Sequence, residues 1–257
     1  MITKKTPEEI DILREGGKRL GTIIEKLSKL IKPGISIEVF EDEARRLIKE
    51  YGDTPAFLNY TPESAKRPFP AALCVCVNDE IVHGIPNENP AILKEGDIIT
   101  LDLGLTHGGL ITDHARTFPV GEISKEAKRL LQVTKEALQS GIKEARVGNR
   151  VGDISAAIES QAIKADLTVI EGLSGHGVGY KIHEDPYVPN EGRKGTGDVL
   201  EAGMVLAIEP MFTPGDGRIS LDKKDGYTYK TSDGTLSAQF EHTVVITEKG
   251  PEILTRF

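Results

Sequence analysis

Residues 97–119, DIITLDLGLTHGGLITDHARTFP, are the stretch around which this chain is organised. Two extended runs rich in β-branched residues, 98–105 and 110–120, stand on either side of a turn signal at 106–109. Apolar runs around a Gly-Gly turn predict a β-hairpin. We expect the remaining elements to pack around this hairpin.

The hairpin brings two acidic side chains together. If the chain folds back at the bond between His107 and Gly108, Asp102 lies directly opposite Asp113. Such residues lie roughly 4.5–5.5 Å apart at Cβ, and like charges at that distance are destabilising. Two carboxylates inside apolar strands therefore need a shared proton or a cation, and we favour the cation. The alternative is a surface pair without function, since hairpin registers slip easily.

The composition excludes several classes of protein. A chain of 257 residues suits one large domain or two small ones, and its net charge of −8 disfavours a nucleic-acid groove. The N-terminus lacks the apolar core of a secretory signal, and no apolar run approaches the roughly 20 residues of a membrane span. Cys74 and Cys76 share one strand face at a spacing unsuited to a disulfide, so we expect a reduced, cytoplasmic protein.

The segment before the hairpin predicts two helices and a strand. Thr6-Pro7-Glu8-Glu9 has the sequence of a capping box and begins the first helix. A second helix is expected over 36–51, a buried strand over 71–78 and a loop over 79–93. The intervening loop, 52–70, contains three aromatic residues, which form either a small packed cluster or the wall of a binding site.

The order of elements then recurs. A helix capped by Ser124, a glycine turn at 146–148 and a helix over 153–165 repeat the first pattern with a shift of 114 residues. Sequence identity between the two copies is slight, so the sign of an internal repeat is weak. It predicts two α/β halves, about 1–122 and 123–257, that share one sheet within a single domain.

The motif GHGVG at 175–179 could be read as a phosphate-binding loop. It lacks the full G-x-G-x-x-G pattern, and the polar residues His183-Glu184-Asp185-Pro186 follow where a helix should open. The glycines fit better with a close approach of the backbone that presents His176.

Two further carboxylates stand in apolar settings. Glu209 lies in the extended run 204–212, and Glu241 lies in the extended run 236–247. Buried carboxylates without partners cost several kcal/mol or become neutral. Four such carboxylates together with His176 form a coherent ligand set for two divalent cations.

The combination of motifs closely resembles the type I methionine aminopeptidases of the pita-bread fold, over essentially the whole chain. The matching residues are 78–86 (NDEIVHGIP), Asp102, Asp113, 175–179 (GHGVG), His183-Glu184, 208–211 (IEPM) and 237–243 (SAQFEHT). The resemblance implies an α+β fold in which two pseudo-symmetric α/β halves surround a curved antiparallel sheet. Residues 1–257 would then form one catalytic domain.

The resemblance also implies a dinuclear metal centre. In the family, the first metal would be bound by Asp113, His176, Glu209 and Glu241, and the second by Asp102, Asp113 and Glu241. A water or hydroxide would bridge the two ions and act as the nucleophile. An oxygen-rich set with one nitrogen suits Mn, Fe, Co or Zn and does not select among them.

The family assigns further roles around this centre. Glu209 would act as the general base, His83 would contact the substrate near the scissile amide, and His183 would stabilise the tetrahedral intermediate. A pocket for the methionine side chain would be lined by Cys74, Tyr60, Ile182 and Tyr227. Ile182 departs from the family pattern, which more often has an aromatic residue there.

The implied function is removal of the initiator methionine from nascent proteins when the next residue is small. The partners would be the N-termini of nascent polypeptides, with the ribosome as a candidate meeting place, and we expect a monomer. The remaining histidines receive structural interpretations. We expect His107 to be solvated in the hairpin turn, and His114 and His242 to face away from the site because strand side chains alternate.

Two rival interpretations remain open. X-Pro aminopeptidases and prolidases share the fold and the five ligands, but usually carry a large extra N-terminal domain and an acidic residue where this chain has His242. A non-catalytic pita-bread binding module would have lost ligands, whereas all five are present here. Only 25 residues separate His183 from Glu209, which leaves no room for the helical insertion of the second type of methionine aminopeptidase.

Overall fold

The computed structural model describes residues 2–62 and 65–256. The helices of this part of the chain are α1 (Pro7–Ser28), α2 (Glu38–Tyr51), α3 (Lys125–Glu144) and α4 (Val151–Lys164). The strands are β1 (Thr54–Pro55), β2 (Cys74–Val77), β3 (Glu80–Val82), β4 (Ile98–His107), β5 (Leu110–Pro119), β6 (Thr168–Val169), β7 (Ser174–Gly177), β8 (Glu184–Pro189), β9 (Val205–Ile208), β10 (Met211–Thr213), β11 (Ile219–Leu221), β12 (Tyr229–Thr231), β13 (Ala238–Gln239), β14 (His242–Thr247) and β15 (Gly250–Ile253).

The four helices occupy the four predicted stretches. At the start of α1, the Thr6 hydroxyl accepts a hydrogen bond from the Glu9 N–H, and the Glu9 carboxylate accepts one from the Thr6 N–H. This reciprocal pair satisfies two amide groups that the helix leaves unpaired. The predicted α+β content is confirmed, and every pairing between the described strands is antiparallel.

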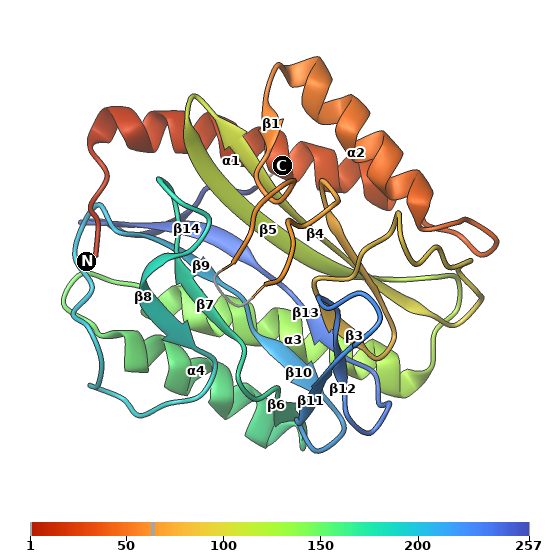
Figure 1. Ribbon diagram of the computed structural model, residues 1–257. Coiled ribbons are helices and arrows are strands. Elements are labelled where there is room, and N and C mark those ends of the chain that lie inside the picture. The colour runs from red at the N-terminus through yellow and green to blue at the C-terminus, as the bar shows by residue number, and fades with distance from the viewer. Residues whose placement is uncertain (1, 63–64, 257) are drawn as a thin grey trace.

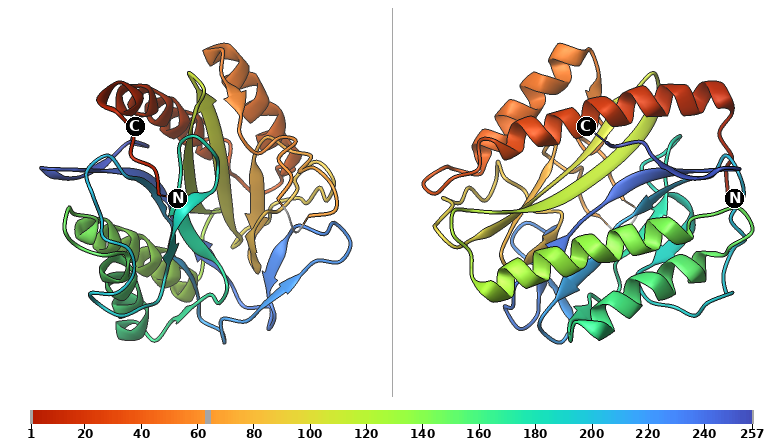
Figure 2. Two further views of the ribbon diagram at one scale, coloured as in Figure 1. Left: turned by 60° about the vertical axis from the view of Figure 1, so that its left-hand side comes forward. Right: turned by 180° about the vertical axis from the view of Figure 1, so that it is seen from behind.

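The helices flank the sheets in two pairs. In Figure 1, α1 and α2 lie in the upper part of the view and α3 and α4 lie in the lower part. Seen from behind, in the right panel of Figure 2, α1 and α3 run across the strands. Each pair covers its own apolar core, which includes Phe40 and Leu101 on the α1–α2 side, and Ile158 and Phe212 on the α3–α4 side. None of the described helices is both long and apolar enough to span a bilayer.

The β4–β5 hairpin is confirmed, but its predicted register is wrong. The turn is formed by the two glycines at 108–109, whose φ angles of 55° and 82° lie in the left-handed region that glycine adopts without strain. Asp102 therefore lies opposite Ala115, and Asp113 lies opposite Gly104. Because the register differs by two residues, both carboxylates still point to the same face, as diagonal neighbours.

Two predicted strands are interrupted at their carboxylates. The 204–212 run divides into β9 and β10 at Glu209, and the 236–247 run divides into β13 and β14 near Glu241. At these breaks the backbone bonds to other elements: the Glu241 N–H donates to the Ala115 carbonyl at 2.8 Å, and the Asn190 side-chain amide donates to the Glu209 carbonyl at 3.0 Å. The predicted loop over 79–93 contains the strand β3, which pairs with β12.

Candidate active site

A cavity of about 960 Å³ opens among the sheets, and every site residue that the sequence predicts lines it. These residues are Tyr60, Cys74, His83, Asp102, Asp113, His176, Ile182, His183, Glu209, Tyr227 and Glu241. Cys74, Asp102, Asp113 and His176 lie on β2, β4, β5 and β7, Glu209 and Glu241 lie at strand breaks, and the other residues lie in loops.

The acidic end of the cavity has the geometry of a metal site. Ligand atoms of Asp113, His176 and Glu241 all lie within 4.8 Å of one another. The His176 Nε2 atom is 3.4 Å from Glu209 Oε1. Because the His176 Nδ1–H donates to the Gly177 carbonyl at 2.9 Å, the lone pair of Nε2 points toward the carboxylates, as a metal ligand requires.

Buried oxygens without hydrogen-bond partners show whether this cluster can bind a cation. Asp102 Oδ1 and Glu241 Oε1 are buried without a hydrogen-bond partner in the described part of the chain. No lysine or arginine of that part forms an ion pair with Asp102, Asp113, Glu209 or Glu241. Buried anionic oxygens without donors are costly, and divalent cations are the partners that such oxygens bind. The residues therefore fit divalent metal ions.

Burial raises the pKa of all four carboxylates. For Asp102 the nearby charge of Asp113 adds to the effect of burial, and for Glu209 and Glu241 the charges of the other carboxylates add to it. Burial raises the pKa of Asp113 to about 7, although a hydrogen bond from the His114 N–H opposes the shift. The cluster therefore holds protons near neutral pH unless a cation replaces them.

Two polar residues that the sequence did not reveal support the cluster. The Thr243 hydroxyl accepts a hydrogen bond from the Asp113 N–H at 2.8 Å and donates to the Asp113 carbonyl at 2.7 Å. The Gln239 side-chain amide donates to Glu209 Oε2 at 3.0 Å. Both residues stand in the segment 237–243, but only the fold shows that Thr243 holds the Asp113 backbone and that Gln239 contacts the Glu209 carboxylate.

Two further histidines, His83 and His183, line the cavity, and burial keeps both neutral. The His183 and His176 rings are 4.5 Å apart and nearly perpendicular. The pKa of His83 is lowered to about 4, first by burial and then by the charge of His183. Burial also lowers the pKa of His183. The Tyr60 hydroxyl lies 3.1 Å from His183 Nδ1, and when it donates to that atom the ring proton resides on Nε2.

The other end of the cavity is apolar. Cys74 packs in a buried cluster with Phe69 and Tyr227, whose rings are 5.2 Å apart in an edge-to-face arrangement. Phe57 packs against this cluster, and Ile182 is also buried. Cys74 lies opposite Asp102 in the β2–β4 pairing, which joins the apolar end to the acidic end. Phe57, Tyr60 and Phe69 all line the cavity, so the aromatic loop forms its wall.

The remaining histidines lie outside the cavity lining. His114 and His242 stack with ring centroids 4.7 Å apart and planes 4° apart, and His114 Nδ1 bonds to the Glu241 carbonyl at 2.5 Å. The prediction that His107 is solvated is wrong. Its side chain is 21% exposed and lies 2.8 Å from Asp53, because the hairpin tip packs against β1 and α1.

An imidazole and four carboxylates that converge inside an α+β fold of antiparallel sheets are typical of a metal-dependent hydrolase. The comparison with protein families is more specific. Residues 11–248 match the model of Metallopeptidase family M24, and the chain belongs to this family.

The individual relatives agree with this assignment. A protein of Bacillus subtilis named methionine aminopeptidase 1 is 44% identical over 256 residues, with 100% of both chains covered. The crystal structure of methionine aminopeptidase from Thermotoga maritima superposes with a TM-score of 0.95 at 42% identity, with 100% of both chains covered. Prolidase from Pyrococcus furiosus shares the fold at a TM-score of 0.75 and 21% identity; the match covers 99% of this chain and 65% of that one. The predicted pita-bread fold is thereby confirmed.

Proposed function

We propose that this metallopeptidase removes the N-terminal methionine from polypeptides whose second residue is small. The observation that carries the proposal is the junction of two environments in one cavity. A carboxylate–imidazole cluster adjoins an apolar pocket of sulfur and aromatic surface, and Cys74 beside Asp102 marks the boundary. The full-length relatives named methionine aminopeptidase support the same activity.

Two divalent metal ions would be held by Asp102, Asp113, His176, Glu209 and Glu241, with Co, Mn, Fe or Zn as candidates. When bound, such ions supply an activated water and polarise the peptide carbonyl. The unpaired Asp102 and Glu241 oxygens and the orientation of His176 Nε2 support this assignment.

The side chains around the cluster have distinct tasks in the proposed reaction. Glu209, held by Gln239, takes the proton of the attacking water and passes it toward the leaving amine. His183, with its proton on Nε2, donates a hydrogen bond to the oxyanion that develops on the carbonyl oxygen. His83 contacts the substrate near the scissile amide. Since burial keeps both imidazoles neutral, neither one brings a positive charge that would repel the metal ions.

The apolar pocket would receive the first side chain. Cys74, Ile182 and Tyr227 form its surface, with Tyr60 at its border with His183. An unbranched thioether gains sulfur–aromatic contacts of roughly 0.3–1.5 kcal/mol there, whereas a charged side chain would lose its hydration. The second substrate residue would lie near His83 and the carboxylates, where Gly, Ala or Ser fits better than Leu or Arg.

The cellular setting is part of the proposal. The enzyme would act in the cytoplasm as a monomer on the N-termini of nascent polypeptides, with the ribosome as the meeting place. Its two halves, 1–122 and 123–257, would form one catalytic domain. The free thiols of Cys74 and Cys76 support a reducing compartment.

A panel of short peptides tests the activity. Met-Gly and Met-Ala peptides should be cleaved with kcat/KM at least ~10²-fold above Leu-Gly or Met-Leu peptides, a discrimination that a shaped apolar pocket can reach. Faster cleavage of Arg-Pro or Leu-Pro peptides than of Met-Ala peptides would instead assign the chain to the prolyl-specific relatives.

A further inference from the structure

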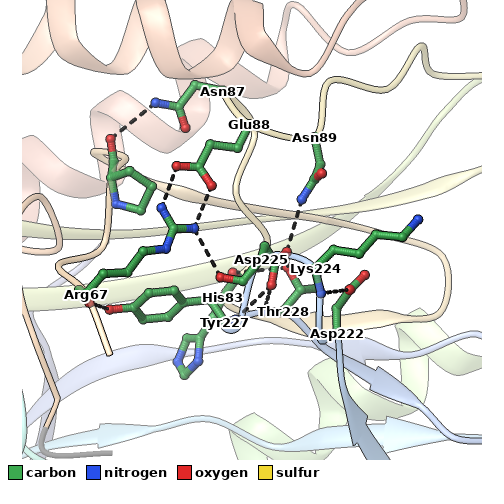
Figure 3. Close-up of polar contacts among 11 residues, drawn as sticks. Arg67, His83, Asn87, Glu88, Asn89, Asp222, Lys224, Asp225, Tyr227 and Thr228 are labelled. Atoms are coloured by element: carbon green, nitrogen blue, oxygen red, sulfur yellow. Dashed lines mark hydrogen bonds and ion pairs between the residues drawn. The ribbon is translucent and has the colours of Figure 1, made fainter. Parts of the chain in front are cut away.

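Three loops meet at the apolar end of the cavity, and an arginine joins them (Figure 3). Arg67 binds Glu88 in a two-pronged arrangement, with both nitrogen–oxygen distances at 2.6 Å. Its Nη2 atom also donates to the Asp225 carbonyl at 3.1 Å. We call Arg67, Glu88 and Asp225 the Arg67 clamp.

The clamp also holds an aromatic wall of the cavity. The Tyr227 hydroxyl donates to the Arg67 carbonyl, and the guanidinium carbon lies 5.7 Å from the Tyr227 ring centroid. Tyr227 in turn meets Phe69 edge to face. Arg67 therefore contacts Tyr227 from the backbone and from the side chain, and Tyr227 is only 6% exposed.

Asp225 connects the clamp to the loop that carries His83. Its Oδ1 atom accepts hydrogen bonds from the N–H groups of Tyr227 and Thr228, at 2.8 and 3.0 Å. Its Oδ2 atom accepts one from the Asn89 side chain at 3.1 Å. Glu88 and Asn89 follow His83 closely in the chain, so the segment beyond His83 and the segment around Tyr227 are tied at adjacent points.

The exposed side chains of the Arg67 clamp indicate a role other than stabilising the fold. The side chains of Arg67 and Glu88 are 38% and 36% exposed, and ion pairs that solvent reaches in this way contribute little to folding. A planar two-pronged bond fixes geometry as well as adding energy. The geometry that it fixes here is the position of Tyr227 and Phe69.

We propose that Arg67 is a positioning residue that sets the shape of the first-residue pocket and thereby its selectivity for methionine. This inference rests on the proposed methionine aminopeptidase activity. Loss of the clamp would free the Tyr227 wall to move, and a wider pocket would hold the thioether less closely. The catalytic cluster does not contact Arg67, so the chemical step should continue at its former rate.

Arg67→Met tests the proposal in the metal-loaded, full-length protein. We expect KM for a Met-Ala peptide to rise about tenfold with kcat within about twofold, because ground-state and transition-state binding fall together. The ratio of kcat/KM between Met-Ala and Leu-Ala peptides should fall about tenfold, the scale of discrimination by one apolar contact. Glu88→Gln should act in the same direction, and the double variant should add little to Arg67→Met because both break one bond.

Arg46→Met is the matched control. Arg46 forms a similar two-pronged bond with Glu43, at 2.7 and 2.6 Å, on the surface of α2 away from the cavity lining. Its kinetics should equal those of the unchanged protein. Unaltered KM and selectivity in Arg67→Met, or a fall in kcat with loss of metal, would overturn the inference. Failure of the unchanged protein to cleave methionyl peptides would instead overturn the proposed function.

Discussion

Two adjacent lysines with different surroundings allow a test of what holds the loop that carries His183. Lys5 Nζ lies 2.7 Å from Glu184 Oε2, and the two side chains are 1% and 6% exposed. Lys4 pairs with Glu201, but both of those side chains are 51% exposed. Glu184 directly follows His183, so the buried pair anchors the loop that carries this proposed catalytic residue to the N-terminal segment.

The expected losses in the free energy of unfolding for Lys5→Met and Lys4→Met differ severalfold. Removing one partner of a buried pair leaves an uncompensated charge and costs about 3–5 kcal/mol, whereas an exposed pair contributes about 0–1 kcal/mol. For a chain of this size, these free energies correspond to a fall in Tm of about 6–20 °C for Lys5→Met and less than about 4 °C for Lys4→Met. Methionine preserves the length of the lysine stem, so the packing loss is small.

The pH dependence of the Lys5→Met effect has a definite sign. Burial raises the pKa of Glu184, but hydrogen bonds from Lys5, Thr3 and the Lys181 N–H outweigh it, so the pKa lies below its ordinary value of 4.5. A carboxyl with a lowered folded-state pKa stabilises the fold above its unfolded pKa and loses that contribution as the pH falls through the folded value. The gap in Tm between Lys5→Met and the unchanged protein should therefore be largest near neutral pH and narrow below about pH 4.5.

Thermal and urea unfolding of the metal-loaded proteins provide the measurement, with kcat as a second readout. We expect Lys5→Met to lower kcat as well, because the loop of His183 loses its anchor. Equal shifts in Tm for the two lysine variants would refute the reasoning. A gap that stays constant from pH 7 to pH 4 would contradict the role of the Glu184 charge.

Three further outcomes are expected. Removal of divalent ions should abolish turnover and lower the Tm, because ions that bind only the folded state stabilise it; full turnover of a chelated sample would exclude metal catalysis. His183→Ala should lower kcat by roughly 10²–10³ with metal content unchanged, whereas His176→Ala should lose metal; equal metal loss in both would assign His183 as a ligand. Gly84→Ala should destabilise the protein by about 1–3 kcal/mol or prevent folding, because a Cβ there would lie 2.1 Å from the Val75 carbonyl oxygen; unfolding in urea measures this, and an unchanged midpoint would contradict it.

Local patterns were sufficient for the helices and for the central hairpin of this fold. The capping box at Thr6 and the apolar periodicity of the helices depend on residues within a few positions of each other, and the structure has all four predicted helices. The hairpin was also predictable as a hairpin. Its register was not, because a turn at 107–108 and a turn at 108–109 leave the same alternation of apolar and polar residues.

The residues that support the site could not be predicted from local sequence patterns. Thr243 contacts Asp113 across 130 positions of sequence, and Arg67 contacts Asp225 across 158. A threonine in a strand or an arginine in a loop has no local signal that points to its partner. The candidate ligands could be predicted from the sequence because charged residues inside apolar runs depart from the usual pattern. Thr243 and Arg67 do not depart from any such pattern.

The burial of charged residues inside apolar runs also explains why the carboxylate cluster is evidence of function. Four buried carboxylates with raised pKa values work against folding, and an arginine or lysine at the cluster would have relieved the repulsion. The described part of the chain instead provides the Gln239 amide and the His114 N–H as donors to the carboxylates, and the Thr243 hydroxyl holds the Asp113 backbone. These neutral groups leave the charge of the carboxylates uncompensated. Such an arrangement is relieved either by protons or by an external cation, so a bound metal ion would contribute both the chemistry and part of the folding free energy.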